Sequence, residues 1–169
     1  MLEIRDETPA DYAAIGEVVG RAFGDEPIPE LVDRLRRDEV VVASLVAVED
    51  GQVVGHIMFT ETPIETGGEE IAGAILSPLA VTPERQGAGI GSALVRQGIE
   101  VCRERGRAAL LVLGHPTYYP RFGFSPELAH RVRSKYSDKG KAYMAMELTP
   151  GALANGGTAR VPATFDLFE

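Results

Sequence analysis

The segment from Leu79 to Val95 constrains the fold of this chain more than any other part. It reads LAVTPERQGAGIGSALV: an apolar stretch, a turn, three glycines at alternate positions and the start of an amphipathic helix. The first N–H groups of a helix have no partner inside the helix, and together with the helix dipole they attract anions. Glycines at this point let a ligand approach the backbone closely. The segment therefore predicts a strand, a loop and a helix that bind a phosphate-bearing group.

Three interpretations of the glycine loop follow from the residues alone. A Walker-type nucleotide loop requires a lysine after the glycines, and Ile90-Gly91-Ser92 contains none. A dinucleotide-binding fingerprint requires the spacing Gly-x-Gly-x-x-Gly after a first strand, whereas Gly87, Gly89 and Gly91 alternate in mid-chain. A tight turn without a ligand is the third interpretation. The residues disfavour the first two interpretations.

Hydrophobic periodicity predicts the elements that precede the glycine loop. Pro78 cannot donate to a sheet ladder, so we expect a bulge or an unpaired residue at that point of its strand. In chain order we expect a strand at 2–5, a helix from Thr8-Pro9 to about Phe23, a helix from Pro29 to Arg37, a hairpin of strands 40–48 and 52–60, a loop at 62–70 and a strand at 71–81.

The remaining elements place the chain in the α+β class, with one domain over residues 1–149. The tail at 150–169 has a loop-like composition, and its apolar residues predict that it docks on the same domain. After the glycines we expect a helix from Ile90 to Arg105, a buried strand at 108–113, an aromatic cluster at 118–124 and two candidate strands at 128–132 and 142–148.

Composition limits the classes of partner. A net charge of −8 argues against general nucleic-acid binding, and no apolar run approaches the ~18 residues that span a bilayer. Cys102 is the only cysteine, which excludes an internal disulfide, and no histidine or carboxylate cluster has metal-ligand spacing. We therefore expect a cytoplasmic protein without metal, nucleic-acid or membrane partners.

Two motifs in order resemble those of the GNAT superfamily of acyl-CoA-dependent N-acyltransferases. The run from Gln86 to Gly91, QGAGIG, is similar to its Gln/Arg-x-x-Gly-x-Gly/Ala motif, and the preceding Leu79-Ala80-Val81-Thr82-Pro83 is similar to its fourth strand. Downstream, Tyr119-Pro120-Arg121-Phe122-Gly123-Phe124 resembles its second hallmark. The resemblance implies a mixed central sheet, flanked by helices, whose fourth and fifth strands splay apart.

The resemblance also implies the cosubstrate and its contacts. Acetyl-CoA would lie between strands 71–81 and 108–113, with its pantetheine amides paired to the backbones of Leu79 and Val81. Backbone N–H groups from Gln86 to Gly91 would hold the pyrophosphate, with the Ser92 hydroxyl as an extra donor. The cofactor-binding residues implied by position are Leu79, Ala80, Val81, Gln86, Gly87, Ala88, Gly89, Ile90, Gly91, Ser92 and Tyr119.

Acyl transfer to an amine requires a deprotonated nucleophile, stabilisation of the carbonyl oxygen and a proton for the leaving thiolate. By motif position, Tyr119 is the candidate acid and the N–H of Val81 the candidate oxyanion donor. The adjacent Tyr118 leaves the assignment of the acid open. Packing of the Tyr119 ring on pantetheine is the alternative role.

Polar residues near the expected cleft are the candidates for binding the amine acceptor and for removing its proton. Acidic residues in the loop after the first helix would attract a cationic amine, and strand 52–60 and its end supply candidate bases. Gly114-His115 stands where many relatives have an asparagine that hydrogen-bonds to the cofactor, which puts that contact in doubt. The candidate acceptor residues are Asp25, Glu26, His56, Glu61 and His115.

These inferences predict an N-acetyltransferase that moves an acetyl group from acetyl-CoA to the primary amine of an unidentified small-molecule or peptide acceptor, by direct attack in a ternary complex. A catalytically silent acyl-CoA-binding sensor of the same fold is the first alternative. A nucleotide-binding or purely structural protein is the second. Association as a homodimer stays open.

Overall fold

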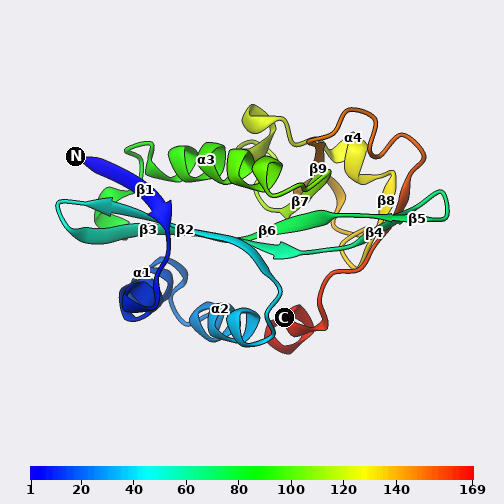
Figure 1. Cartoon of the computed structure of the whole chain (residues 1–169). Helices are drawn as coiled ribbons and strands as arrows, with labels where there is room; N and C mark the ends of the chain where they lie inside the picture. The colour runs from blue at the N-terminus through cyan, green and yellow to red at the C-terminus, as the bar shows by residue number, and fades with distance from the viewer.

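A six-stranded mixed sheet forms the centre of the computed structural model, which describes residues 1–169 (Figure 1). Its strand order is β1-β2-β3-β6-β7-β9, and only β6 and β7 run parallel to each other. The strands are β1 (Leu2–Asp6), β2 (Val41–Glu49), β3 (Gln52–Glu61), β6 (Gly73–Val81), β7 (Ala109–Leu113) and β9 (Tyr143–Glu147).

Helices cover both faces of this sheet (Figure 1). On one face lie α1 (Tyr12–Phe23) and α2 (Ile28–Arg37), and on the other lies α3 (Ile90–Glu104). Each face has its own apolar core, because alternate residues of a strand point to opposite sides. Ile15, Leu35 and Met58 belong to the first core, and Leu94, Cys102 and Phe59 to the second.

The expected loop at 62–70 is wrong, because most of it forms a hairpin of a second, smaller sheet. Turn glycines Gly67 and Gly68, both with positive φ, connect β4 (Ile64–Thr66) to β5 (Glu69–Ile71), so the expected strand 71–81 is divided between β5 and β6. The order of this sheet is β5-β4-β10-β8, in which β10 is Gly157–Ala159 and β8 is Val132–Arg133.

The expected strand at 128–132 is also wrong. Ser125 accepts a hydrogen bond from the backbone N–H of Leu128 and starts α4 (Pro126–Ala129), after which β8 spans only Val132–Arg133. A serine followed by a proline is a helix start that outweighs the short apolar run.

The tail beyond Thr149 adds a strand to the smaller sheet and a 3₁₀ helix that packs against α2. β10 (Gly157–Ala159) pairs antiparallel with β4 and parallel with β8. A 3₁₀ helix, Ala163–Phe168, packs against α2, and the side chain of Phe165 is buried there.

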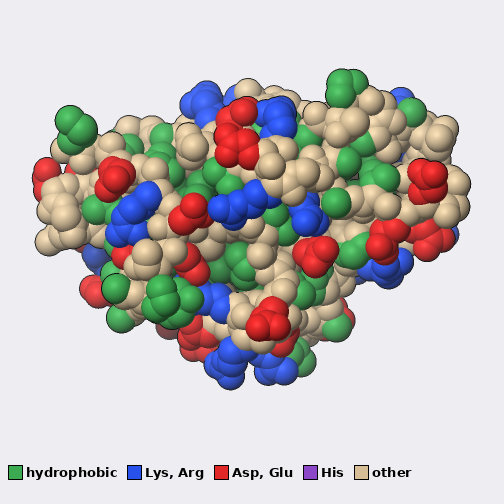
Figure 2. All heavy atoms as spheres, in the orientation of Figure 1, with side chains coloured by type: hydrophobic (Ala, Val, Ile, Leu, Met, Phe, Trp, Pro, Cys, Tyr) green, Lys and Arg blue, Asp and Glu red, His purple; other side chains and the backbone are tan.

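Charged side chains are interspersed on the face that Figure 2 shows, where acidic and basic groups alternate rather than form one-sided patches. None of the helices is both long enough and apolar enough to cross a bilayer.

The strands β6 and β7 separate after four residue pairs, from Gly73–Ala109 to Leu76–Val112. β6 continues for five more residues alongside β3, with a register shift: Ile57 is opposite Leu79, and Phe59 is opposite Leu76. Ser77 and Pro78 therefore form a bulge, which confirms the irregularity expected at Pro78. The separation opens a gap in the middle of the sheet.

Candidate acyl-donor cleft

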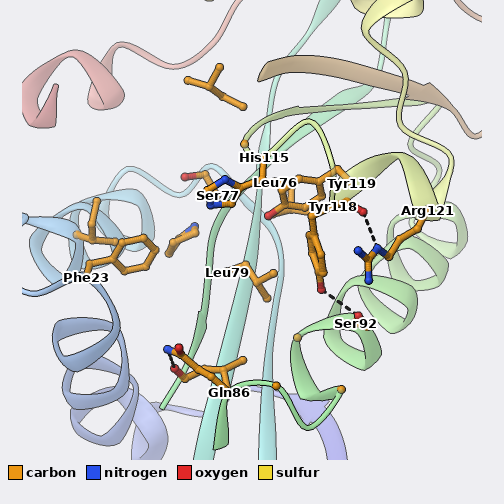
Figure 3. Close-up of a pocket in the computed structure, with 18 of the residues that line it drawn as sticks. Phe23, Leu76, Ser77, Leu79, Gln86, Ser92, His115, Tyr118, Tyr119 and Arg121 are labelled. Carbon is orange, nitrogen blue, oxygen red and sulfur yellow. Dashed lines mark hydrogen bonds between the residues drawn. The ribbon is translucent and has the colours of Figure 1, made fainter. Parts of the chain in front are cut away.

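A cleft of about 770 Å³ occupies this gap (Figure 3). One wall is β6 from Leu76 to Val81, and the opposite wall is the end of β7 with the loop that follows it. The glycine loop and the start of α3 form one end of the cleft. Phe23 and Ile28, where α1 ends and α2 begins, line the cleft from the face of the sheet that α1 and α2 cover.

The edge of β6 that faces the cleft offers backbone hydrogen-bonding groups. Thr82 donates its N–H to the carbonyl of Val54 at 2.9 Å, so the peptide groups of Thr82 and Ala80 point to β3. By strand alternation those of Leu79 and Val81 point to the opposite side, into the gap. Gln86 donates from Nε2 to the Val81 carbonyl at 3.0 Å, which agrees with this direction.

The glycine loop leaves room for an anion. Gly87 and Gly89 have φ of 81° and 85°, a region that residues with a side chain rarely adopt, and a Cβ at either position would meet nothing within 4 Å. Gly89 is the N-cap of α3, and no side chain caps this helix. The first N–H groups of α3 thus have no side-chain acceptor, so the loop fits a bound pyrophosphate.

Three of the residues expected to hold the cosubstrate do not line the cleft. Ala80 pairs with His56 across the ladder between β6 and β3, and the side chain of Ile90 is buried in the core beneath α3. Ala88 is exposed at the tip of the loop. In this arrangement Ala88 and Ile90 have only backbone groups to offer.

The two adjacent tyrosines have different surroundings (Figure 3). The hydroxyl of Tyr118 lies 3.0 Å from Ser92 Oγ, at the start of α3, and the Arg121 guanidinium lies 4.6 Å from the centre of the Tyr118 ring. Tyr119 is 8% exposed and packs edge-to-face on Phe124. Burial, with a smaller contribution from Tyr118, raises the pKa of Tyr119 to about 12, so its phenol stays protonated at neutral pH.

Gly114 explains how the Tyr119 ring reaches the cleft. A Cβ at Gly114 would lie 2.4 Å from a carbon of this ring, so any side chain at that position would displace the tyrosine. The next residue, His115, is exposed and lines the cleft as predicted. No carboxylate lines the cleft. Two arginines, Arg85 and Arg121, belong to its lining.

Comparison with known proteins identifies the family. Residues 3–126 match the family model described as the acetyltransferase (GNAT) domain, which is more than half of the chain. The chain belongs to the GNAT acetyltransferase family.

Relatives of this GNAT chain include two proteins of Escherichia coli K12. It is 35% identical to the uncharacterized N-acetyltransferase YhbS over 159 residues, which are 94% of this chain and 93% of YhbS. It is 45% identical to the uncharacterized N-acetyltransferase YjhQ over 119 residues, which are 69% of this chain and 66% of YjhQ.

Solved GNAT structures have the same architecture. The crystal structure of E. coli YhbS in complex with CoA aligns with a TM-score of 0.89 at 32% identity, over 99% of this chain and 93% of that one. A GNAT family acetyltransferase from Brucella melitensis, in complex with acetyl-CoA, aligns with a TM-score of 0.79 at 35% identity, over 98% and 99% of the two chains.

His56, a candidate base, lies outside the GNAT cleft. Its side chain is fully buried on the α1/α2 face, where Nε2 is 2.8 Å from Ser44 Oγ and 3.6 Å from Glu7 Oε1. Burial lowers the pKa of His56 and favours its neutral form. Strand alternation turns this side chain inward, so the prediction that it faces an acceptor is wrong.

The acidic candidates are not in the cleft lining either. Glu61 is the last residue of β3 and pairs with Ala74, at the end of β6 away from the cleft, where it lies 3.6 Å from Arg107. Asp25 and Glu26 are exposed in the turn between α1 and α2. Their flanking residues Phe23 and Ile28 line the cleft instead.

Several residues that line the GNAT cleft were not predicted from the sequence. Arg121 stands inside the quoted aromatic motif, and Arg85 directly precedes the glycine loop, so both were available as cations near a phosphate site. Phe23 and Ile28 carry no chemical signal, because their position depends on how α1 and α2 meet the gap in the sheet.

Proposed function

We propose that this chain transfers an acetyl group from acetyl-CoA to a primary amine by direct attack in a ternary complex. Its family makes it an N-acetyltransferase, and acetyl-CoA is the cosubstrate that the family and the two CoA-bound relatives indicate. The observation that carries the proposal is a single cleft that joins the open edge of β6 to the uncapped start of α3.

The donor is held mainly by backbone groups in this proposal. The N–H groups around Gly87 and Gly89 bind the pyrophosphate, because they lie at a helix N-terminus and the glycines leave space. Leu79 and Val81 present their peptide groups to the pantetheine arm and the thioester, as a neighbouring strand would. Arg85 and Arg121 line the same cleft and add positive charge near the phosphates.

Acetyl-CoA supplies a thioester carbon that the amine nitrogen attacks, so that a C–N bond forms, the C–S bond breaks, the nitrogen loses a proton and the thiolate gains one. Val81 is nearer the glycine loop than Leu79, which lies next to the Ser77-Pro78 bulge. The arm runs from the loop toward the bulge, and the N–H of Leu79 therefore joins that of Val81 as a candidate donor to the carbonyl oxygen.

Tyr119 supplies the proton to the leaving sulfur in this scheme. Its raised pKa, about 12, keeps the phenol protonated, and the Tyr119 hydroxyl has no hydrogen-bond partner within the protein. Tyr118 is a weaker candidate because its hydroxyl is already within hydrogen-bonding distance of Ser92.

His115 is the proton acceptor that the cleft itself offers. An imidazole nitrogen can accept a proton, and the cleft lining contains no carboxylate that could take this role instead. We propose that His115 removes the amine proton, directly or through one water. Asp25 and Glu26 stand at the rim of this site and attract a cationic amine from solvent.

Calorimetry and an amine panel together test the proposal. Acetyl-CoA should bind with measurable heat, and release of free CoA should rise with at least one amine of a panel that contains polyamines, amino sugars, peptide N-termini and lysine peptides. An absence of heat at millimolar acetyl-CoA would overturn the donor assignment. Binding without CoA release from any amine would favour the sensor alternative.

A further inference from the structure

A second, smaller cavity adjoins the cleft at the point where β6 and β7 separate. It has a volume of about 150 Å³, and it shares Ile28, Leu76, Ser77 and Leu113 with the main cleft. The rest of its lining consists of Leu31 of α2, Ile75 of β6, Tyr136, Phe165, Phe168 and Glu169. Four of these residues lie beyond the part of the chain that matches the family model.

The lining is mostly apolar, and its phenol and its carboxylate are already paired. Tyr136 donates its hydroxyl to Glu169 Oε1 at 2.6 Å, and Lys135 Nζ lies 2.6 Å from Glu169 Oε2. Lys135 also pairs with Asp166, so this loop fastens the 3₁₀ helix Ala163–Phe168 over the cavity. A cationic amine would find no unpaired carboxylate here, whereas a hydrocarbon group would lose nothing by entering.

The position of the cavity relative to the cleft indicates which reactant it holds, the acyl donor or the amine. The donor's phosphates lie at the glycine loop, and its arm follows β6 from Val81 to Leu79 and on to Ser77. The acyl group therefore arrives at the shared boundary of the two cavities, and any extra carbons continue into the smaller one. His115 lines the main cleft and not the smaller cavity, so the main cleft remains for the amine.

We infer that this cavity is an acyl-chain subsite and that the enzyme uses longer aliphatic acyl-CoA donors, of about four to six carbons, in addition to acetyl-CoA. A cavity of similar size lined by Leu, Ile and Phe binds a group as large as benzene. The inference rests on the proposed function, since it takes the donor's direction in the cleft from it.

Calorimetry with acetyl-CoA and butyryl-CoA tests the inference without a known acceptor. Each buried methylene tightens binding about fourfold, so butyryl-CoA, with two more methylenes, should bind about fifteenfold more tightly than acetyl-CoA. Equal or weaker binding of butyryl-CoA would overturn the subsite while leaving the proposed function intact. Failure of acetyl-CoA itself to bind would instead overturn the proposed function.

Two variants at residues of the cavity lining make the test specific. Leu31→Phe fills the cavity and should abolish the preference for butyryl-CoA. Phe168→Ala enlarges it and should shift the preference toward hexanoyl-CoA. Leu167→Ala is the matched control, because this neighbouring side chain is 61% exposed and lies outside the cavity. If both cavity variants keep the wild-type ratio of affinities, the cavity does not hold the acyl chain.

Discussion

Tyr118 and Tyr119 leave the same turn but have different tasks in the proposed mechanism. Replacement of Tyr119 by phenylalanine removes the proposed acid without creating a cavity. We expect kcat to fall about a hundredfold, within the usual range for a general acid, and the Kd for acetyl-CoA to stay within about twofold. The rate of CoA release gives kcat, and calorimetry gives the Kd.

Tyr118→Phe is the paired control for that experiment. It breaks the contact with Ser92 but leaves the Tyr119 hydroxyl in place. A large loss of kcat in Tyr118→Phe together with a fully active Tyr119→Phe would assign the acid to the other tyrosine.

Gly89 permits a test of the phosphate site at a single position. Gly89→Leu places a side chain at φ 85°, which costs stability, and fills the space left for the pyrophosphate. We expect the Kd for acetyl-CoA to rise at least tenfold. Gly106→Leu suffers comparable backbone strain at φ 79°, at the far end of α3, and should keep the wild-type Kd. Similar affinities in the two variants would remove Gly89 from the donor site.

His115 is tested by substitution. With an acceptor found in the amine panel, His115→Gln should lower kcat about a hundredfold, because glutamine keeps the polarity but cannot accept a proton. The Kd for acetyl-CoA, measured by calorimetry, should stay within about twofold. An unchanged kcat would indicate that another group, or solvent, removes the amine proton.

At the scale of elements, a buried polar network joins α2 to the central sheet. Arg36 of α2 donates two hydrogen bonds of 2.9 Å to Glu7, which follows β1, and Ser44 of β2 donates one of 2.5 Å to the same carboxylate. Burial by itself raises the pKa of Glu7, but the neighbouring His56, Arg36 and Ser44 outweigh it and lower the pKa to about 2.

This network predicts that acid destabilises the fold. The lowered pKa of His56 means that the unfolded chain binds its proton first, so stability falls as the pH drops below about 7. Glu7 adds to the loss as the pH falls from its ordinary value of about 4.5 toward 2. Urea unfolding between about pH 7 and 3 should give a steadily decreasing free energy of unfolding.

Glu7→Gln should lower the stability at pH 7 and flatten its decline below pH 5. Glu61→Gln, at an exposed carboxylate that faces Arg107, is the matched control and should follow the wild-type curve. Parallel curves for the wild-type protein and Glu7→Gln would contradict the role given to this network.

Elements whose signals are local could be predicted from the sequence. The bulge at Pro78 follows from a missing N–H, and the start of α3 follows from the glycines that precede it. The hairpin of β4 and β5 was missed because its strands have three residues each, too few for a periodic pattern. Short strands of this kind are stabilised by pairing with distant segments, here β10.

The candidate site divides in the same way. The expected donor side depends on backbone geometry that glycine and proline specify locally, and most of the residues expected there line the cleft. The acceptor side depends on which face a side chain takes. The sequence of β3 is apolar on both sides of His56, so its pattern does not indicate that His56 points under α1 and α2 rather than toward the cleft.

At the scale of the whole molecule, the tail and the domain depend on each other for their cores. Leu153 is fully buried although it lies in the tail, and it belongs to the same core as Ile64 of β4. Leu153→Ala should therefore lower the free energy of unfolding by about 3 kcal/mol, the usual cost of truncating a buried leucine. The exposed Leu167→Ala should change it by less than about 0.5 kcal/mol.

Chemical denaturation of both variants measures these values. It also tests our proposal that residues 150–169 dock on the domain at 1–149 rather than form a separate unit. A Leu153→Ala variant as stable as the wild-type protein would mean that the tail contributes little to the stability of the domain.

The open edge of β6 has a consequence for how such a protein can change over time. Peptide groups are the same whatever side chains accompany them, so substitutions at Leu79 or Val81 would leave the proposed hydrogen bonds to the donor in place. Two relatives that share only 32% and 35% of their residues with this chain were crystallised with CoA and acetyl-CoA. Under the proposed function, substitutions can therefore change the amine side of the cleft while the backbone contacts to the donor are kept.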